Sequence, residues 1–168
     1  MAAPKFIIEP LEARHDRAAF SCGVHSLDVY LKTQARQDLK KHAAIPFVIT
    51  PDGKKIAGYY TLSQYAVELD LVPKELARKL PKYPMVSVTL LGRLAVSSEF
   101  RGQGLGATLL MDALQRSLRL SNEVASAGVV VDAIDASAIA FYKKFGFLEL
   151  PEVERRLFLP IGTIVKLL

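Results

Sequence analysis

Residues 85–133 hold two apolar, β-branched runs separated by a glycine-rich turn and a helical repeat, and this order restricts the possible folds more than any other feature. The runs "MVSVTLLGRLAVS" (85–97) and "AGVVVDA" (127–133) predict strands, the first with a bend or bulge at Gly92 and the second fully buried. Between them, apolar residues recur every three to four positions, which predicts a helix that begins inside the turn. We therefore expect a sheet with helices packed on it.

The rest of the chain completes a mixed order of helices and strands. Apolar stripes and turn residues place the elements, with Ser26 as a candidate N-cap. The further predicted strands are 5–9, 45–50, 55–69, 147–150 and 155–162, and the further predicted helices are 26–42, 73–80 and 135–145. This order predicts an α/β (α+β) fold whose sheet is mixed but mostly antiparallel.

Length and composition fit one globular domain over residues 1–168. The chain is 51% hydrophobic and 23% charged, with a net charge of +5. Cys22 is the only cysteine, so an intramolecular disulfide is excluded and a reducing compartment is favoured. Acidic residues interrupt the N-terminal segment, and no apolar run reaches the roughly 18 residues of a membrane span. We therefore expect a cytoplasmic protein without a membrane partner.

The turn "FRGQGLGATLL" (100–110) has three alternative interpretations as an anion site. A phosphate-binding loop of the Walker type needs Lys and then Ser or Thr after the last glycine, and Ala107 and Thr108 stand there instead. The dinucleotide pattern GxGxxA is met by Gly102, Gly104 and Ala107, but no acidic residue stands at the end of a following strand at the required distance, and Glu123 falls in a polar loop. The third pattern, Arg-x-x-Gly-x-Gly, is met by Arg101, Gly104 and Gly106. The alternative is a purely structural glycine turn before a helix, with Arg101 in solvent and no anion bound.

Four blocks in order resemble the GNAT acetyltransferase superfamily. They are "LLGRLAV" (90–96), the Arg-x-x-Gly-x-Gly loop, "VVVDA" (129–133) and "AIAFYKKFGF" (138–147). The resemblance implies the GNAT fold, with a sheet of six to seven strands flanked by about four helices. It also implies an acyltransferase that uses acetyl-CoA (coenzyme A).

Three further blocks, "FSCGVHSLDVYL" (20–31), "GYYTLS" (58–63) and "RLFLP" (156–160), extend the resemblance to the acetyltransferase toxins of bacterial toxin–antitoxin systems. Such toxins acetylate the α-amino group of aminoacyl-tRNA and block translation. The resemblance implies a small ribbon-helix-helix antitoxin as partner and the ability to form a homodimer. Two alternatives are an acetyltransferase for a small amine or a protein N-terminus, and a catalytically silent binder of coenzyme A.

The resemblance also assigns site residues. Tyr142 corresponds to the general acid, although a tyrosine at this position could instead be a core residue. Asp135 stands where many members carry Asn, so its contact with the cofactor is in question. The cofactor-binding residues implied are Leu94, Ala95, Val96, Arg101, Gly102, Gln103, Gly104, Leu105, Gly106, Ala107, Asp135 and Phe141.

The predicted strand before the glycine-rich turn, which the resemblance places beside acetyl-CoA, is called the donor strand here. It lacks a general base, because "VSVTLLGRLAV" holds no Glu, Asp or His. At pH 7, deprotonating a lysine amine costs about 4.6 kcal/mol, whereas an α-amine costs only about 1 to 1.4 kcal/mol. The α-amine of an aminoacyl ester therefore depends less on a general base for its deprotonation than a lysine amine does. Glu68 or Asp70 could still act from the neighbouring strand.

Two basic clusters could be solvated helix faces or contacts for tRNA phosphates. Arg93 could face the acceptor's 3′ end or be buried beside a carboxylate. The three histidines lack metal-ligand spacing, so no metal is expected. The candidate tRNA contacts are Lys32, Arg36, Lys40, Lys41, Lys79, Lys82 and Arg93.

Overall fold

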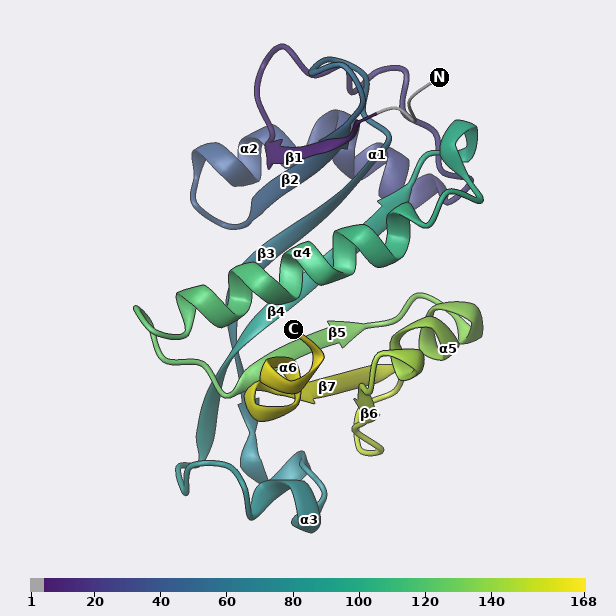
Figure 1. The fold of residues 1–168 in the computed structure, drawn as a ribbon. Helices are drawn as coiled ribbons and strands as arrows, with labels where there is room; N and C mark the ends of the chain where they lie inside the picture. The colour runs from purple at the N-terminus through teal and green to yellow at the C-terminus, as the bar shows by residue number, and fades with distance from the viewer. Residues whose placement is uncertain (1–4) are drawn as a thin grey trace. The chain divides into compact units, whose positions relative to one another are not determined.

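A computed structural model describes residues 5–168 and shows an α/β protein built on a seven-stranded sheet (Figure 1). The strands are β1 (Ile7–Pro10), β2 (Ile45–Thr50), β3 (Gly58–Glu68), β4 (Met85–Val96), β5 (Gly128–Asp132), β6 (Leu148–Glu149) and β7 (Arg156–Pro160). The helices in these residues are α1 (His25–Thr33), α2 (Ala35–Lys40), α3 (Lys74–Ala77), α4 (Leu105–Leu120), α5 (Ala136–Lys144) and α6 (Ile161–Leu167).

The strand order is β1-β2-β3-β4-β5-β7-β6. The β1–β2, β2–β3, β5–β7 and β6–β7 pairs are antiparallel, whereas β4 and β5 pair in parallel, with Leu91 opposite Val131. Helix α4 forms the connection between the two parallel strands, as such a pair requires. The predicted fold class is confirmed.

The chain divides into two compact units, and β3, β4 and α4 contribute to both. The first unit comprises Met1–Ser63, described from residue 5, and Gly92–Ala113; the second comprises Gln64–Leu91 and Leu114–Leu168. The prediction of a single domain remains a prediction.

The first unit packs α1 against the sheet. Leu27, Tyr30 and Leu31 face inward because they lie three to four positions apart on one stripe. They join Val48 and Tyr59 in one core. The Tyr59 hydroxyl donates a hydrogen bond of 2.7 Å to the Leu27 carbonyl, which satisfies a polar group inside this core.

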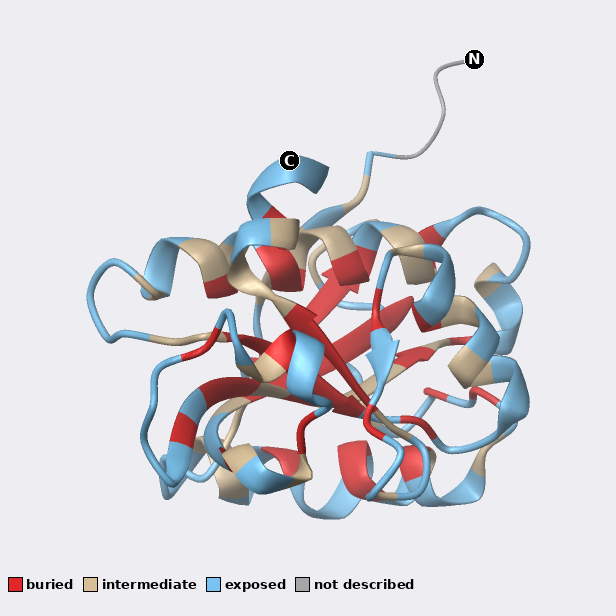
Figure 2. Ribbon diagram, turned by 90° about the horizontal axis from the view of Figure 1, so that it is seen from below, coloured by how far each residue is buried: buried red, intermediate tan, exposed pale blue. Residues whose placement is uncertain are grey.

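The second unit has its own core of aliphatic and aromatic residues. It includes Leu76 of α3, Val88 of β4, Val130 of β5 and Phe158 of β7. Strand β5 is buried along nearly its whole length, as its unbroken valine run predicts (Figure 2). In residues 5–168, none of the helices is long and apolar enough to cross a lipid bilayer.

Two predicted elements differ from the structure. The helix predicted over 26–42 is interrupted at Gln34, next to a hydrogen bond of 2.7 Å from the Thr33 hydroxyl to the Val29 carbonyl, a type of bond that bends helices. Ser26 is not the N-cap, because the helix begins at His25 after Val24.

The second difference lies in the tail, where the predicted strand 155–162 ends at Pro160 and α6 begins at Ile161. These two changes raise the number of α-helices in residues 5–168 from the expected four or so to six.

Candidate functional site

The glycine-rich turn is an exposed loop whose backbone donors are free. Gly102 and Gly104 have φ of +81° and +74°, and a Cβ added at either would have no atom within 4 Å. These glycines are therefore required by backbone conformation and not by crowding. Over residues 5–168, no hydrogen bond is made by the N–H groups of Gly102, Gln103 and Gly104. Such a row of free donors is the geometry that binds phosphate.

Helix α4 follows the loop directly and adds its own unpaired N–H groups. Leu105, its first residue, is buried, while Gly106 and Ala107 are half-buried. The Thr108 N–H donates to the Gly104 carbonyl at 3.2 Å, which closes the first turn. The positive end of the helix dipole therefore lies at the glycine-rich turn, the anion site predicted from the sequence.

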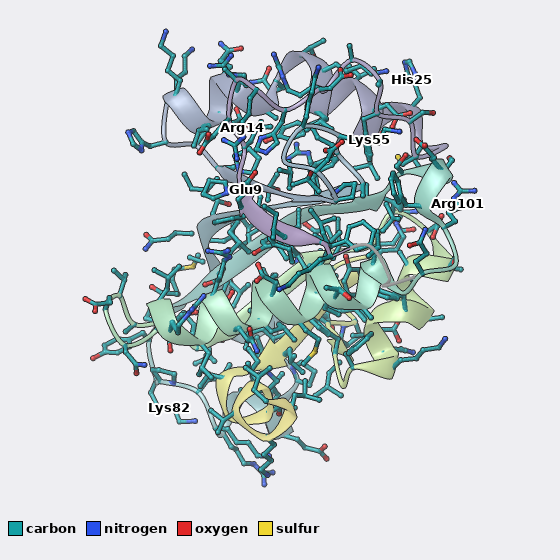
Figure 3. All side chains as sticks on the ribbon, turned by 45° about the horizontal axis from the view of Figure 1, so that its top comes forward. Glu9, Arg14, His25, Lys55, Lys82 and Arg101 are labelled. Carbon is teal, nitrogen blue, oxygen red and sulfur yellow. The ribbon has the colours of Figure 1, made fainter. Side chains whose placement is uncertain are left out.

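Arg101 does not point freely into solvent. Its Nη2 donates a hydrogen bond of 2.5 Å to the carbonyl oxygen of Cys22. Figure 3 labels Arg101 among the side chains. The preceding residue is also anchored, because the Phe100 ring packs edge-to-face on Phe6 with centroids 5.9 Å apart. No sequence pattern signals the contact with Cys22, since the two residues are 79 positions apart.

The donor strand β4 runs unbroken through Gly92. A Cβ at this glycine would lie 3.0 Å from Thr61 Oγ1, so glycine allows a close approach between neighbouring strands. Leu94 and Val96 are half-buried, and the side chain of Ala95 packs in the core of the first unit. Backbone groups are therefore what this segment can offer a ligand.

Tyr142 lies on α5 in the second unit, between two other aromatic rings. Its ring centroid is 5.2 Å from Phe141 and 5.3 Å from Phe147, and the residue is 7% exposed. In residues 5–168 every fully buried side-chain N or O atom has a hydrogen-bond partner, and the Tyr142 hydroxyl makes no hydrogen bond. The oxygen must therefore reach the surface. Burial raises the pKa of Tyr142, so the phenol stays protonated at neutral pH.

Asp135 caps α5. Its Oδ1 accepts a hydrogen bond of 2.8 Å from the Ala138 N–H, which satisfies a free donor of the first turn. Its role in this structure is local, and a contact with the cofactor remains a prediction.

Arg93 lies flat on an aromatic ring. Its guanidinium carbon is 3.5 Å from the centroid of Tyr30, and the Tyr30 hydroxyl donates a 2.8 Å hydrogen bond to Asp38. The hydrogen bond from Gln34 is the main cause that lowers the pKa of Asp38, and Tyr30 and Arg93 add to it. Arg93 is half-buried, and among the described residues no carboxylate lies within ion-pair distance of it. The sequence identified Arg93 but not the ring beneath it.

The predicted phosphate contacts are all exposed or half-buried but fall in different units. Helices α1 and α2 and their C-terminal end carry one group in the first unit, and the segment after α3 carries the other in the second unit. Lys82 also donates to the Ala77 carbonyl at 3.3 Å and so caps α3. The members of the two groups are Lys32, Arg36, Lys40, Lys41, Lys79 and Lys82.

This fold and these sites define an acetyltransferase. The chain belongs to the acetyltransferase (GNAT) family, whose model matches residues 12–147. It is 32% identical to "Probable toxin TacT" of Sinorhizobium fredii (strain NBRC 101917 / NGR234), over 99% of this chain and 97% of that protein. It is 35% identical to the "tRNA-acetylating toxin" of Mycobacterium tuberculosis (strain ATCC 25618 / H37Rv), over 79% of this chain and 78% of that protein.

Solved structures agree over nearly the whole chain. A tyrosine-to-phenylalanine mutant of KacT superposes with a TM-score of 0.89 at 28% identity, covering 97% of this chain and 99% of that one. AtaT complexed with acetyl-methionyl-tRNAfMet superposes with a TM-score of 0.88 at 32% identity and the same coverage. A tyrosine-to-phenylalanine mutant of AtaT, bound to acetyl-CoA and the C-terminus of its antitoxin AtaR, gives 0.82 at 28% identity, covering 97% of each chain.

Proposed function

We propose that this protein is a bacterial toxin that transfers the acetyl group of acetyl-CoA to the α-amino group of an aminoacyl-tRNA and so blocks translation. The observation that carries the proposal is the similarity to a probable toxin over 99% of the chain, to a tRNA-acetylating toxin over 79% of it, and to AtaT solved with acetyl-methionyl-tRNA over 97% of it. The free backbone donors of residues 102–104 fit an anionic donor molecule such as acetyl-CoA.

Acetyl-CoA supplies an activated thioester when bound. The loop N–H groups and the N-terminus of α4 hold the pyrophosphate, with Leu105, Gly106 and Ala107 in the first turn. The backbone of Leu94 and Val96 pairs with the pantetheine arm, and a backbone N–H near Ala95 holds the oxyanion. Phe141 packs beside Tyr142. When the acceptor amine attacks the thioester carbonyl and the C–S bond breaks, the Tyr142 phenol would give its proton to the thiolate of coenzyme A. The raised pKa keeps that proton in place until the thiolate forms.

The lack of a side-chain base on β4 supports an ester-linked α-amine as the acceptor over a lysine amine. At pH 7 such an amine loses its proton for about 1 to 1.4 kcal/mol, so water can accept it. Glu68 and Asp70, the alternative bases named from the sequence, are exposed and belong to the second unit. The basic residues of α1, α2 and the segment after α3 contact tRNA phosphates, and Arg93 faces the 3′ end.

The similarity to the same toxins supports a proposal about the binding partners of this protein. A small antitoxin neutralises the protein, as the AtaT complex with AtaR and the KacTA–DNA complex suggest by analogy. The antitoxin is of the ribbon-helix-helix type, the toxin can form a homodimer, and both act in the cytoplasm.

The decisive experiment is acetyl transfer from labelled acetyl-CoA to a set of aminoacyl-tRNAs. We expect label on the aminoacyl group of at least one tRNA and none on deacylated tRNA. A parallel panel of small amines and peptides with free N-termini tests the alternative acceptors. Label only in that panel would overturn the tRNA assignment, and label nowhere despite coenzyme A binding would indicate a silent binder.

A further inference from the structure

We propose that Arg101 is a positioning residue that connects the glycine-rich turn at residues 101–104, here called the donor loop, to residues 21–23, the segment before α1. In this proposal Arg101 does not act mainly as a ligand of the cofactor's phosphates. The proposal rests on the proposed function in one respect, that the loop binds coenzyme A. It departs from the expectation that the family resemblance implied, which placed Arg101 among the residues that bind the cofactor.

Residues 97–101 meet residues 21–22 through three hydrogen bonds within the first unit. The Ser98 N–H donates to the Ser21 carbonyl at 2.8 Å, and Ser97 Oγ approaches the same oxygen at 3.5 Å. Arg101 Nη2 adds the shortest contact, 2.5 Å to the Cys22 carbonyl. A hydrogen bond from a guanidinium is charge-assisted and stronger than a neutral one. Arg101 therefore makes the strongest of the three contacts.

The segment before α1 is shaped to receive this side chain. Gly23 has a φ of +86°, and a Cβ at this position would lie 2.8 Å from Arg101 Nη2. The positive φ favours glycine, and a Cβ here would displace the end of the flexible Arg101 side chain from its contact with Cys22. On its other side the segment is fixed to α1, because the Cys22 N–H donates to Asp28 Oδ1 at 2.9 Å. The two carbonyls and the guanidinium thus form a continuous connection from the loop to the first helix.

Such a connection matters because the loop N–H groups have no partners of their own to hold them. An unrestrained loop would lose conformational freedom when it closes on a pyrophosphate, and this loss weakens binding. A loop anchored at Arg101 presents its donors in advance. Arg101 therefore increases the affinity for coenzyme A through preorganisation.

Binding of coenzyme A by calorimetry tests this without any acceptor. Gly23→Ala keeps the charge of Arg101 but blocks its contact with Cys22, and Arg101→Lys keeps the charge on a shorter side chain. We expect each to weaken binding about tenfold, the size of one charge-assisted hydrogen bond. Gly53→Ala is the matched control, since Gly53 has a similar φ of +81° and no atom within 4 Å of an added Cβ; it should bind as wild type does.

Salt separates the two roles of Arg101. Raising KCl from about 0.1 M to about 1 M shortens the Debye length from about 10 Å to about 3 Å and weakens a direct phosphate contact. We expect the ratio of the Arg101→Lys and wild-type affinities to stay constant. Wild-type affinity in Gly23→Ala, or a ratio that collapses in high salt, would overturn the positioning role. If the wild-type protein bound no coenzyme A, the proposed function itself would fail.

Discussion

At the scale of single residues, Tyr142 combines an enclosed ring with a hydroxyl that reaches the surface. Its ring is enclosed by Phe141 and Phe147, yet its hydroxyl makes no hydrogen bond within residues 5–168. Buried tyrosine hydroxyls normally find a partner. Burial raises the pKa of Tyr142, so the phenol carries its proton at pH 7 and is held in place by its ring, as a proton donor to a leaving group must be.

Tyr142→Phe tests this role. Because the hydroxyl has no partner in the described chain, the substitution should leave the free energy of unfolding within about 0.5 kcal/mol of wild type. The transfer rate should fall by roughly 10²- to 10⁴-fold, as expected for the loss of a general acid. Single-turnover acetylation and thermal unfolding measure the two effects. Tyr83→Phe, at a ring that is 69% exposed, is the control, and an unchanged rate in Tyr142→Phe would exclude the acid role.

The chemically important side chains were more predictable than the groups they touch. Arg93, Arg101 and Tyr142 are recognisable from their motifs. The Cys22 carbonyl that Arg101 binds and the Tyr30 ring under Arg93 were missed, because both come from distant segments that only the folded chain brings close.

At the scale of elements, the donor loop needs glycine for its backbone and not for space. Gly104→Ala should destabilise the loop by about 1 kcal/mol or more, because its φ of +74° disfavours a side chain. Coenzyme A binding should weaken with it. Gly162→Ala is a matched control in α6, where an added Cβ also meets nothing, and it should stabilise the protein by about 0.5 to 1 kcal/mol. Equal effects at both positions, by calorimetry and thermal unfolding, would contradict this explanation.

Strand β1 carries a pH-dependent contact. Glu9 Oε1 lies 2.7 Å from Nε2 of the buried His15, and the hydrogen bond from His15 is the main cause that lowers the pKa of Glu9. A lowered carboxyl pKa contributes stability that is complete above the unfolded value, near 4.5, and is lost as pH falls through the lower folded value.

Glu9→Gln removes the charge that His15 and Arg14 face and should therefore cost about 1 to 2 kcal/mol of unfolding free energy at pH 7. The difference from wild type should shrink as pH falls from about 4.5 through the lower folded pKa of Glu9, below which both proteins are neutral at this position. Urea denaturation at a series of pH values measures it. Glu75→Gln, at an exposed position, should show no such trend; a pH-independent difference for Glu9→Gln would point to packing instead of charge.

Most helices and strands were predictable because their periodicities are strong, and the failures have local causes. The break between α1 and α2 depends on the geometry at Gln34, which the apolar stripe does not reveal. Helix α6 was missed because Ile161, Thr163, Ile164 and Val165 are β-branched and continue the pattern of β7.

At the scale of the whole molecule, cationic groups are available in both compact units. If both bind tRNA, replacing either group should reduce the salt dependence of binding, by about 0.7 to 0.9 in log–log slope for each phosphate that is no longer neutralised. The variants are Lys32/Arg36/Lys40/Lys41→Ala in the first unit and Lys79/Lys82→Ala in the second. Lys54/Lys166→Ala, at two other exposed lysines, is the control. An unchanged slope for one group would remove that group from the interface.

The single thiol of the chain also has a practical consequence. Cys22 is the only cysteine in 168 residues, and burial is the main cause that raises its pKa, so the thiol is neutral and shielded at pH 7. The same residue supplies the carbonyl that holds Arg101. Its rate of alkylation is therefore a natural reporter of whether the glycine-rich loop is anchored, readable by mass spectrometry in the unmodified protein without an added probe.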